Sequence, residues 1–327
     1  MSPGSPVRPG NRLDLTLRHL VPADVPRVGE ILHEAFNEVF VAHGYPAPIP
    51  ELAAGRALVS AYRDYEPDGS IVAVHEGRIV GSAFFHRRGD RAGVGPVTVD
   101  PVYQGSGVGR RLMERVMDEV SDCASIRLFQ DAFNRASFAL YVRLGFVVRD
   151  VMAVLRAEPA RFGPAEAPGG PPRPAPDGPA GAAGPPAGVC REMKPGDLVD
   201  MVACDVALTG MNRPRDLAFL SEHGPTAVLE RGVEIRGFAA SFVVKDTLFL
   251  GPAAAPSAAD LVRLAADVTG RSGARVVSAR APSRPGDLLE KLLQAGFEVR
   301  SLGTYMVRGH YEEPRGVFLA SLFPEAL

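Results

Sequence analysis

The two halves of this 327-residue chain carry the same motifs in the same order, and this repetition constrains the fold more than any other feature. Each half begins with a segment that predicts a strand, a turn and the start of a helix, LRHLVPADV in one and CREMKPGDL in the other. Two alternating strands around a glycine turn follow, and later a helix that ends at glycine and continues into a strand. The paired segments are 17–25 and 190–198, 71–85 and 227–242, and 140–150 and 292–301. One mixed α/β layer fold is therefore expected twice in tandem.

Residues 158–188 separate the two repeats and consist mainly of proline, glycine and alanine. Such a composition offers almost nothing large to bury, so the segment is predicted to be a disordered or extended linker. The expected organisation is a disordered N-terminus, a first domain, the linker, a second domain and a C-terminal tail. Their predicted boundaries are 1–12, 13–157, 158–188, 189–310 and 311–327.

The charge and the cysteine content exclude several classes of protein. Lysine and arginine number 36 against 38 aspartates and glutamates, so neither a nucleic acid nor an anionic membrane surface is an expected partner. The three cysteines, Cys123, Cys190 and Cys204, have neither a zinc-type spacing nor the density of a disulfide framework. No stretch approaches the roughly 20 apolar residues of a membrane span. We therefore expect a cytoplasmic protein in a reducing environment, with no bound metal.

A glycine-rich loop, QGSGVGR at residues 104–110, stands between a predicted strand and a predicted helix. Glycines at this density let backbone N–H groups approach an anion, and the following helix adds its unpaired N-terminal donors. The loop has no lysine for a Walker A motif, and Arg110 stands where a dinucleotide fingerprint needs its third glycine. A phosphate-bearing ligand of another kind is therefore predicted.

The loop resembles the Q/R-x-x-G-x-G/A motif with which the GNAT superfamily of acyltransferases binds acyl-coenzyme A. The preceding segment GVGPVTVDP is similar to the fourth strand of that family, and FNRASFALYVRLGF at residues 133–146 is similar to its tyrosine-bearing helix. The resemblance covers residues 13–157. It implies the GNAT fold and an N-acetyltransferase that uses acetyl-coenzyme A as cosubstrate to acylate an amine of a small molecule.

The resemblance also assigns the residues that would bind coenzyme A. The backbone of the fourth strand would hold the pantetheine arm, the loop would hold the pyrophosphate, and an asparagine would bind the pantetheine or the adenine end. Arg110, with its neighbour Arg111, would reach a further phosphate or lie on a solvated helix face, and the asparagine would alternatively cap its helix. The assigned residues are Val97, Thr98, Val99, Gln104, Gly105, Ser106, Gly107, Val108, Gly109, Arg110 and Asn134.

Two side chains are candidates for catalysis. Tyr141 matches the family tyrosine that protonates the departing thiolate, with a packing role as the alternative. Asp131 ends a predicted strand that borders the active site in the family, so it is the best placed general base, although a capping aspartate is also possible at such a position. His33, Glu34 and His43 lie in the segment that walls the acceptor pocket in the family, as further base candidates.

The second repeat departs from the pattern at the positions that carry the chemistry. Residues 250–261 have the strand and the helix but no glycine loop, and Asp260 places a negative charge where a phosphate would bind. Leu292 occupies the place of Tyr141. The second domain is therefore predicted to be a degenerate GNAT copy. A sensor or scaffold protein that binds acyl-coenzyme A without turnover remains the alternative to an enzyme, and no oligomeric state is predicted.

Overall fold

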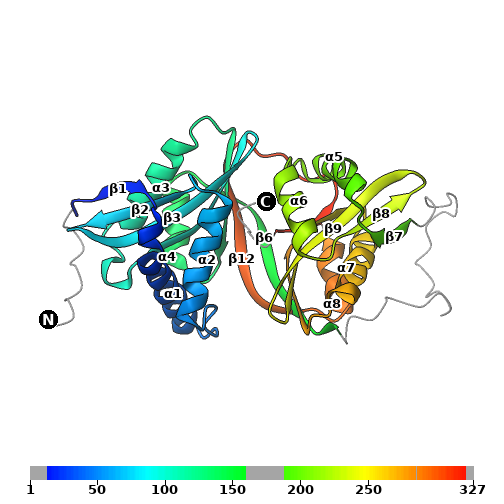
Figure 1. Cartoon of the computed structure of the whole chain (residues 1–327), viewed down its shortest axis with the longest axis horizontal. Helices are drawn as coiled ribbons and strands as arrows, with labels where there is room; N and C mark the ends of the chain where they lie inside the picture. The colour runs from blue at the N-terminus through cyan, green and yellow to red at the C-terminus, as the bar shows by residue number, and fades with distance from the viewer. Residues whose placement is uncertain (1–12, 160–187, 285, 322–327) are drawn as a thin grey trace. The chain divides into compact units, whose positions relative to one another are not determined.

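The computed structural model describes residues 13–159, 188–284 and 286–321. The chain forms two compact units (Figure 1). The first contains the residues up to Arg149 together with Tyr305–Tyr311, and the second contains Asp150–Thr304 together with the segment that begins at Glu312. Most of the predicted linker, and the whole predicted disordered N-terminus, lie outside the described residues, so both stay predictions.

The first unit is a mixed sheet covered by helices on both faces. Its strands follow the order β1-β2-β3-β4-β5-β12; β1 to β4 pair in antiparallel fashion, and β4 pairs with β5 in parallel. The elements are β1 (Thr16–His19), α1 (Val25–Ala42), α2 (Leu52–Tyr65), β2 (Ser70–His75), β3 (Arg78–Arg88), β4 (Arg91–Val99), α3 (Val108–Glu119), β5 (Ser125–Asp131), α4 (Arg135–Arg143) and the end of β12 (Glu298–Gly309).

Alternation along the central strands separates two apolar cores in this unit. Ile71 and Ala73 of β2 pack in the core under α3 and α4, whereas Val72 between them packs in the core under α1 and α2. Apolar residues that recur every four positions in the sequence predict one packed stripe along α3 and its C-cap. This prediction is confirmed, since all members of the stripe lie buried in the first of these cores. They are Val108, Leu112, Val116 and Val120.

The second unit repeats this architecture. Its strands follow the order β7-β8-β9-β10-β11-β6, and β13 pairs with β10. The elements are β6 (Val147–Ala157), β7 (Val189–Glu192), α5 (Leu198–Thr209), α6 (Pro214–His223), β8 (Ala227–Arg231), β9 (Glu234–Val244), β10 (Thr247–Ala255), α7 (Ala258–Ser272), β11 (Val276–Pro282), α8 (Gly286–Gln294), the beginning of β12, and β13 (Val317–Leu319). The prediction of a tandem mixed α/β fold is confirmed. The segment expected as a C-terminal tail contributes the short strand β13.

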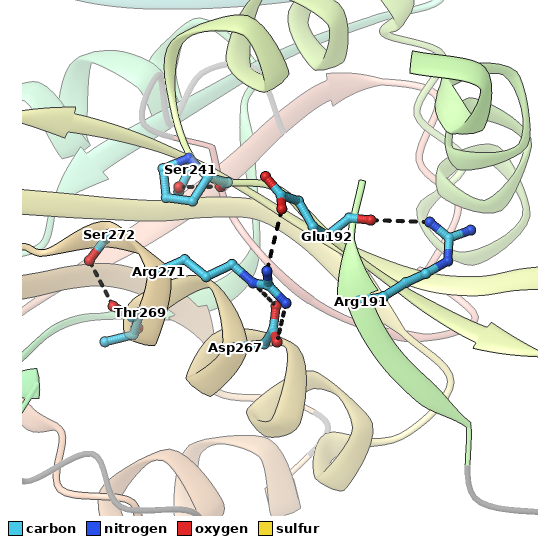
Figure 2. A network of polar contacts seen from close by, with 8 residues as sticks. Arg191, Glu192, Ser241, Asp267, Thr269, Arg271 and Ser272 are labelled. Carbon is cyan, nitrogen blue, oxygen red and sulfur yellow. Dashed lines mark hydrogen bonds and ion pairs between the residues drawn. The ribbon is translucent and has the colours of Figure 1, made fainter. Parts of the chain in front are cut away.

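The Arg-x₅-Asp motif that opens each repeat has the same geometry twice. Arg18 makes a two-pronged ion pair with Asp24 at 2.6 and 2.9 Å, and its guanidinium also donates to the carbonyl of His19. Arg191 pairs with Asp197 at 2.6 and 3.0 Å. Arg191 also donates to the carbonyl of Glu192 (Figure 2). These hydrogen bonds lower the pKa of both aspartate carboxyls. Each motif therefore ties the first strand of its unit to the start of the following helix.

The second unit has an ion pair in its interior and a network of ion pairs on its surface. Asp205 on α5 and Arg213 before α6 are 0% and 2% exposed, and the Arg213 Nε donates to the Asp205 carboxylate at 2.7 Å. The hydroxyl of Thr209 also donates to this carboxylate, at 2.7 Å. On the surface, Arg271 of α7 pairs with Asp267 at 2.8 Å and reaches Glu192 on β7 (Figure 2).

Each unit takes one strand from the other half of the sequence. In the first unit, Met306 of β12 enters the core under α3, and the amide of His310 donates to the carbonyl of Ala124 at 2.8 Å. In the second unit, residues 152–157 of β6 pair with residues 277–282 of β11. The predicted boundaries place β6 in the first domain and β12 in the second, whereas most of β6 belongs to the second compact unit and the end of β12 belongs to the first.

Among the described residues, no helix is long and apolar enough to span a membrane.

Candidate active site

The sheet of the first unit opens between β4 and β5. In the described structure, pairing joins the two strands only at Arg91–Ser125, Ala92–Ile126 and Gly93–Arg127. The rest of β4 stays paired with β3, and the amide of Asp100 donates to the carbonyl of Val80 at 3.0 Å. Because hydrogen-bonding direction alternates along an antiparallel strand, the backbone of Val97 and Val99 faces the side of β5.

Thr98 is oriented differently from its two neighbours. Alternation turns its backbone toward β3, and its buried hydroxyl lies 2.9 Å from the hydroxyl of Ser82. Val99 faces the opening, where its carbonyl accepts a hydrogen bond from the Gln104 side chain at 3.3 Å. Of the three residues predicted to bind the pantetheine arm, only Val97 and Val99 therefore direct backbone groups toward the opening.

The glycine loop has the conformation that its sequence predicts. Gly105 and Gly107 have φ angles of +76° and +93°, and Gly107 is the N-cap of α3. The first hydrogen bond of the helix joins the Arg111 amide to the Gly107 carbonyl at 3.1 Å, so the amides of residues 108–110 precede the helical ladder. The side chain of Ser106 donates to the Tyr103 carbonyl inside the loop.

Space around the loop differs between its glycines. A Cβ at Gly107 would have no protein atom within 4 Å, so the requirement for glycine there comes from the positive φ and from the approach of a ligand. A Cβ at Gly109 would make ordinary contacts of 3.6 Å with Leu140 and Val99. Arg110 lies at the start of α3, and its exposed side chain is 4.0 Å from Glu114.

We expect Gly107→Ala to raise the Kd for coenzyme A by at least about tenfold. A side chain at φ +93° costs roughly 1–2 kcal/mol, and relief of that strain would turn the loop amides away from their present direction. Isothermal titration calorimetry measures the change. Gly89→Ala is a matched control, because Gly89 has a φ of +64° with no atom near its Cβ but lies in the β3–β4 turn. Equal affinities in the Gly107 variant and the wild type would contradict the prediction.

Tyr141 is buried on α4 and keeps its proton. Its side chain is 9% exposed and packs edge-on against Phe146 with ring centroids 6.0 Å apart. Burial raises the pKa of the Tyr141 phenol to about 12, and the negative charge of Asp131 adds to this effect. The structure therefore brings the two predicted catalytic residues within electrostatic reach of each other.

Asp131 and Asn134 shape the turn between β5 and α4. The carbonyl of Asp131 accepts from the Asn134 amide at 2.9 Å, and the Asn134 side chain caps α4 by accepting from the Ser137 amide at 3.2 Å. The buried Gln130 side chain donates to the Asn134 carbonyl at 2.9 Å. Asn134 thus has the capping role that the sequence offered as its alternative, which holds the start of α4 beside Asp131.

The further base candidates lie on α1 and just after it. His33 and Glu34 are within the helix, with Glu34 exposed, and His43 is exposed at its C-terminal cap. The Nδ1 of His43 is 2.7 Å from the carbonyl of Val39, and its ring lies 5.2 Å from the ring of Phe133. His43 is thus the candidate that reaches the β5–α4 turn.

Asp100 is a site-supporting residue that the sequence analysis missed. Its carboxylate accepts from the Val102 amide at 2.9 Å and forms an ion pair with Arg27 of α1. The Asp-Pro step at residues 100–101 is a typical capping signal and could have indicated this role. Asp100 therefore anchors the beginning of the glycine loop to α1.

The corresponding place in the second unit contains a carboxylate of the protein itself. Ser257 caps α7 by accepting from the Asp260 amide at 3.2 Å, and its hydroxyl donates to the Asp260 carboxylate at 2.7 Å. Arg231 of β8 pairs with the same carboxylate at 2.8 Å. Leu292, the counterpart of Tyr141, is fully buried in the apolar core.

Comparison with known proteins identifies the family. Residues 30–146 match the model described as the acetyltransferase (GNAT) family. The N-alpha-acetyltransferase RimI of Mycobacterium tuberculosis is 33% identical over 136 residues, which are 40% of this chain and 78% of RimI. An uncharacterized protein of Mycobacterium leprae is 31% identical over 131 residues, which are 39% of this chain and only 33% of that protein.

Solved structures resemble both units together. A GCN5-related N-acetyltransferase from Sphaerobacter thermophilus has a TM-score of 0.59 at 19% identity, covering 90% of this chain and 95% of the other. A tandem GNAT protein from the clavulanic acid biosynthesis pathway has a TM-score of 0.57 at 14% identity, covering 91% of this chain and 100% of the other. The chain belongs to the GNAT family of acetyltransferases, has the tandem fold, and is an acyltransferase, as its resemblance to the family indicated.

Enzymes of this family use acetyl-coenzyme A and an acceptor substrate. Among the described residues there is no group of three or more histidine, cysteine, aspartate or glutamate side chains that could hold a metal ion.

Proposed function

We propose that the first unit transfers an acetyl group from acetyl-coenzyme A to a primary amine of a small molecule, by direct attack of the amine on the thioester. The observation that carries this proposal is the opening between β4 and β5 beside the glycine loop, in which Gly105 and Gly107 have positive φ angles at the start of α3. A buried, protonated phenol and a partly exposed carboxylate are the two groups that such a reaction requires.

Coenzyme A would bind along the opening between β4 and β5. The loop from Gln104 to Gly107 and the first amides of α3, at residues 108–110, would hold the pyrophosphate, which suits the positive end of the helix dipole. The backbone of Val97 and Val99 would bind the pantetheine arm. Arg110, at the exposed start of α3, would contribute positive charge near a phosphate. Asn134 would stabilise the start of α4, the helix that bears Tyr141, through its capping hydrogen bond.

The chemistry then takes three proton transfers and no covalent enzyme intermediate. Asp131 would accept a proton from the ammonium group of the acceptor, directly or through a water molecule. The amine nitrogen forms a bond to the thioester carbon, and the Val97 N–H, on the open side of β4, would stabilise the resulting oxyanion. The C–S bond breaks, and Tyr141 donates its proton to the thiolate. The nitrogen would then lose its remaining extra proton to the tyrosinate, directly or through water, and Asp131 would release its proton to solvent. The products are the acetylated amine and coenzyme A.

Release of free thiol from acetyl-coenzyme A, measured with a panel of small amines, tests this proposal. A protein that senses acyl-coenzyme A would bind the thioester and release no thiol with any amine. The similarity to RimI favours a second candidate, acetylation of the N-terminal α-amine of a protein or peptide. That candidate would be supported if peptides were acetylated and free small amines were not.

We further propose that only the first unit binds acetyl-coenzyme A, so that the full chain takes up one equivalent. In the second unit, the Asp260 carboxylate already accepts from Ser257 and Arg231 at the start of α7, and its charge would repel a phosphate. Calorimetric titration of the full chain should give a stoichiometry of one, and Gly107→Ala should weaken that single binding event. Two equivalents, or strong binding that the Gly107 variant leaves unchanged, would contradict this division of labour.

A further inference from the structure

An aromatic cluster includes a residue of the turn that follows the proposed general base. Phe133, two residues after Asp131, stacks on Tyr45 with ring centroids 4.6 Å apart and an angle of 26° between the rings. Phe40, on the last turn of α1, meets the same ring edge-on at 4.9 Å, and His43 lies 5.2 Å from it. We define the aromatic cluster as Phe40, His43, Tyr45 and Phe133.

Folding alone does not account for this cluster. Within the described residues of the first unit, the two apolar cores contain none of Phe40, Tyr45 and Phe133. These three side chains are half-buried, and His43 is exposed. Partly exposed aromatic rings gathered at one place are typical of binding surfaces, because they bury large areas with little loss of side-chain freedom.

Two residues supply polar groups to this region, His43 and Asp131. The carbonyl of Val39 can only accept a hydrogen bond, so the Nδ1 of His43 carries the hydrogen and donates to it. Asp131 offers a negative charge at the end of β5. Phe133 follows in the turn between β5 and α4, so this ring and the proposed general base belong to the same end of β5.

We infer that the aromatic cluster binds the side group of the acceptor, and that the acceptor is a primary amine with an aromatic or large aliphatic group. This inference rests on the proposed acetyltransferase function. A short amine such as glycinamide reaches Asp131 but leaves the rings uncovered, whereas phenylalaninamide presents the same amino group with an aromatic side chain next to it.

Thiol release by the full chain with these two amides tests the inference. We expect kcat/KM to be about 10- to 100-fold higher for phenylalaninamide than for glycinamide. Burial of an aromatic side group typically changes the ratio of two kcat/KM values by about this factor. Phe133→Ala should reduce this ratio to less than about threefold. Tyr45→Ala should reduce it as well, and this second variant lies outside the turn that carries Asp131.

Phe219→Ala is the matched control. Phe219 of the second unit stacks on His223 at 4.2 Å and is also half-buried, so its loss should leave the ratio of the two amides unchanged. Equal kcat/KM for the two amides, or a ratio that survives in both cluster variants, overturns the inference.

Failure of the proposed function has a different signature, which is the absence of thiol release with every amine. Calorimetry with phenylalaninamide and glycinamide in the presence of coenzyme A then decides the inference alone. Tighter binding of phenylalaninamide that is lost in Phe133→Ala supports it, and equal binding of the two amides overturns it.

Discussion

Tyr141→Phe is expected to lower kcat by roughly 10²–10⁴ and to change the affinity for coenzyme A by less than about twofold. The variant removes one hydroxyl and keeps the ring that packs against Phe146. Without the phenol proton, the thiolate must leave unprotonated or take a proton from water. Steady-state thiol release at saturating substrates, supported by single-turnover measurements, reports the loss.

Tyr305→Phe is the matched control for this variant. Tyr305 is likewise buried in the first unit and has its pKa raised to about 12 by burial, but it lies on β12 near Arg127. Its replacement should leave kcat within a few-fold of the wild-type value. Wild-type kcat in Tyr141→Phe, under conditions in which the chemical step limits the rate, would show that Tyr141 serves only for packing.

Tyr141→Phe should also change how the stability of the protein depends on pH in the alkaline range. The pKa of Tyr141 is raised from 10 to about 12 on folding, so the unfolded chain loses this proton first as the pH rises. Unfolding therefore becomes easier above pH 10, and Tyr141 contributes nothing to the pH dependence well below that value. Between pH 9 and 11 the free energy of unfolding of the wild type should fall by about 1 kcal/mol more than that of Tyr141→Phe. Parallel denaturant titrations at the two pH values measure this difference.

Asp205→Asn is expected to destabilise the second unit by about 3–5 kcal/mol. The substitution keeps the size of the side chain but removes the negative charge that faces the Arg213 guanidinium, in a place where both side chains are almost completely excluded from water. A buried cation that has lost its counter-charge is costly because the protein interior solvates it poorly. Urea denaturation followed by circular dichroism should show an earlier transition.

Asp267→Asn provides the comparison on the surface of the same unit. Figure 2 shows its ion pair with Arg271. The side chain of Arg271 is 38% exposed, and exposed ion pairs contribute about 0–1 kcal/mol. A small effect in Asp267→Asn together with a large one in Asp205→Asn would show that burial decides the outcome. Similar small effects in both variants would mean that water reaches the Asp205–Arg213 pair.

Local features of the fold could be predicted from the sequence because interactions between residues close together in the chain determine them. The strand, turn and helix start at residues 17–25 and 190–198 were predicted from their repeated motif, and the Arg18–Asp24 and Arg191–Asp197 ion pairs lie within these local segments. The glycine loop is also local, because Gly105 and Gly107 adopt positive φ angles that other residues rarely tolerate. The stripe of α3 followed from helical periodicity alone.

Features that depend on distant parts of the chain could not be predicted in this way. Asp260 was expected to repel a phosphate, but its partner Arg231 comes from a strand 29 residues earlier, which no local pattern reveals. The aromatic cluster joins Phe133 to Phe40 and Tyr45, far apart in sequence. The strand β13 has only three residues, too few for an alternating pattern to stand out.

The exchanged strands have a consequence for the order in which the protein can be completed during synthesis. Every residue proposed to act in catalysis or to bind coenzyme A precedes Asp150, yet the unit that holds them is closed along β5 by Tyr305–Tyr311. The growing chain therefore presents an unpaired strand edge beside Ala124 until residues 305–311 have been made, after the whole of the second repeat from Val189 to Thr304. A premature stop after Thr304 would leave every proposed active-site residue in place and still deprive the active unit of its last strand.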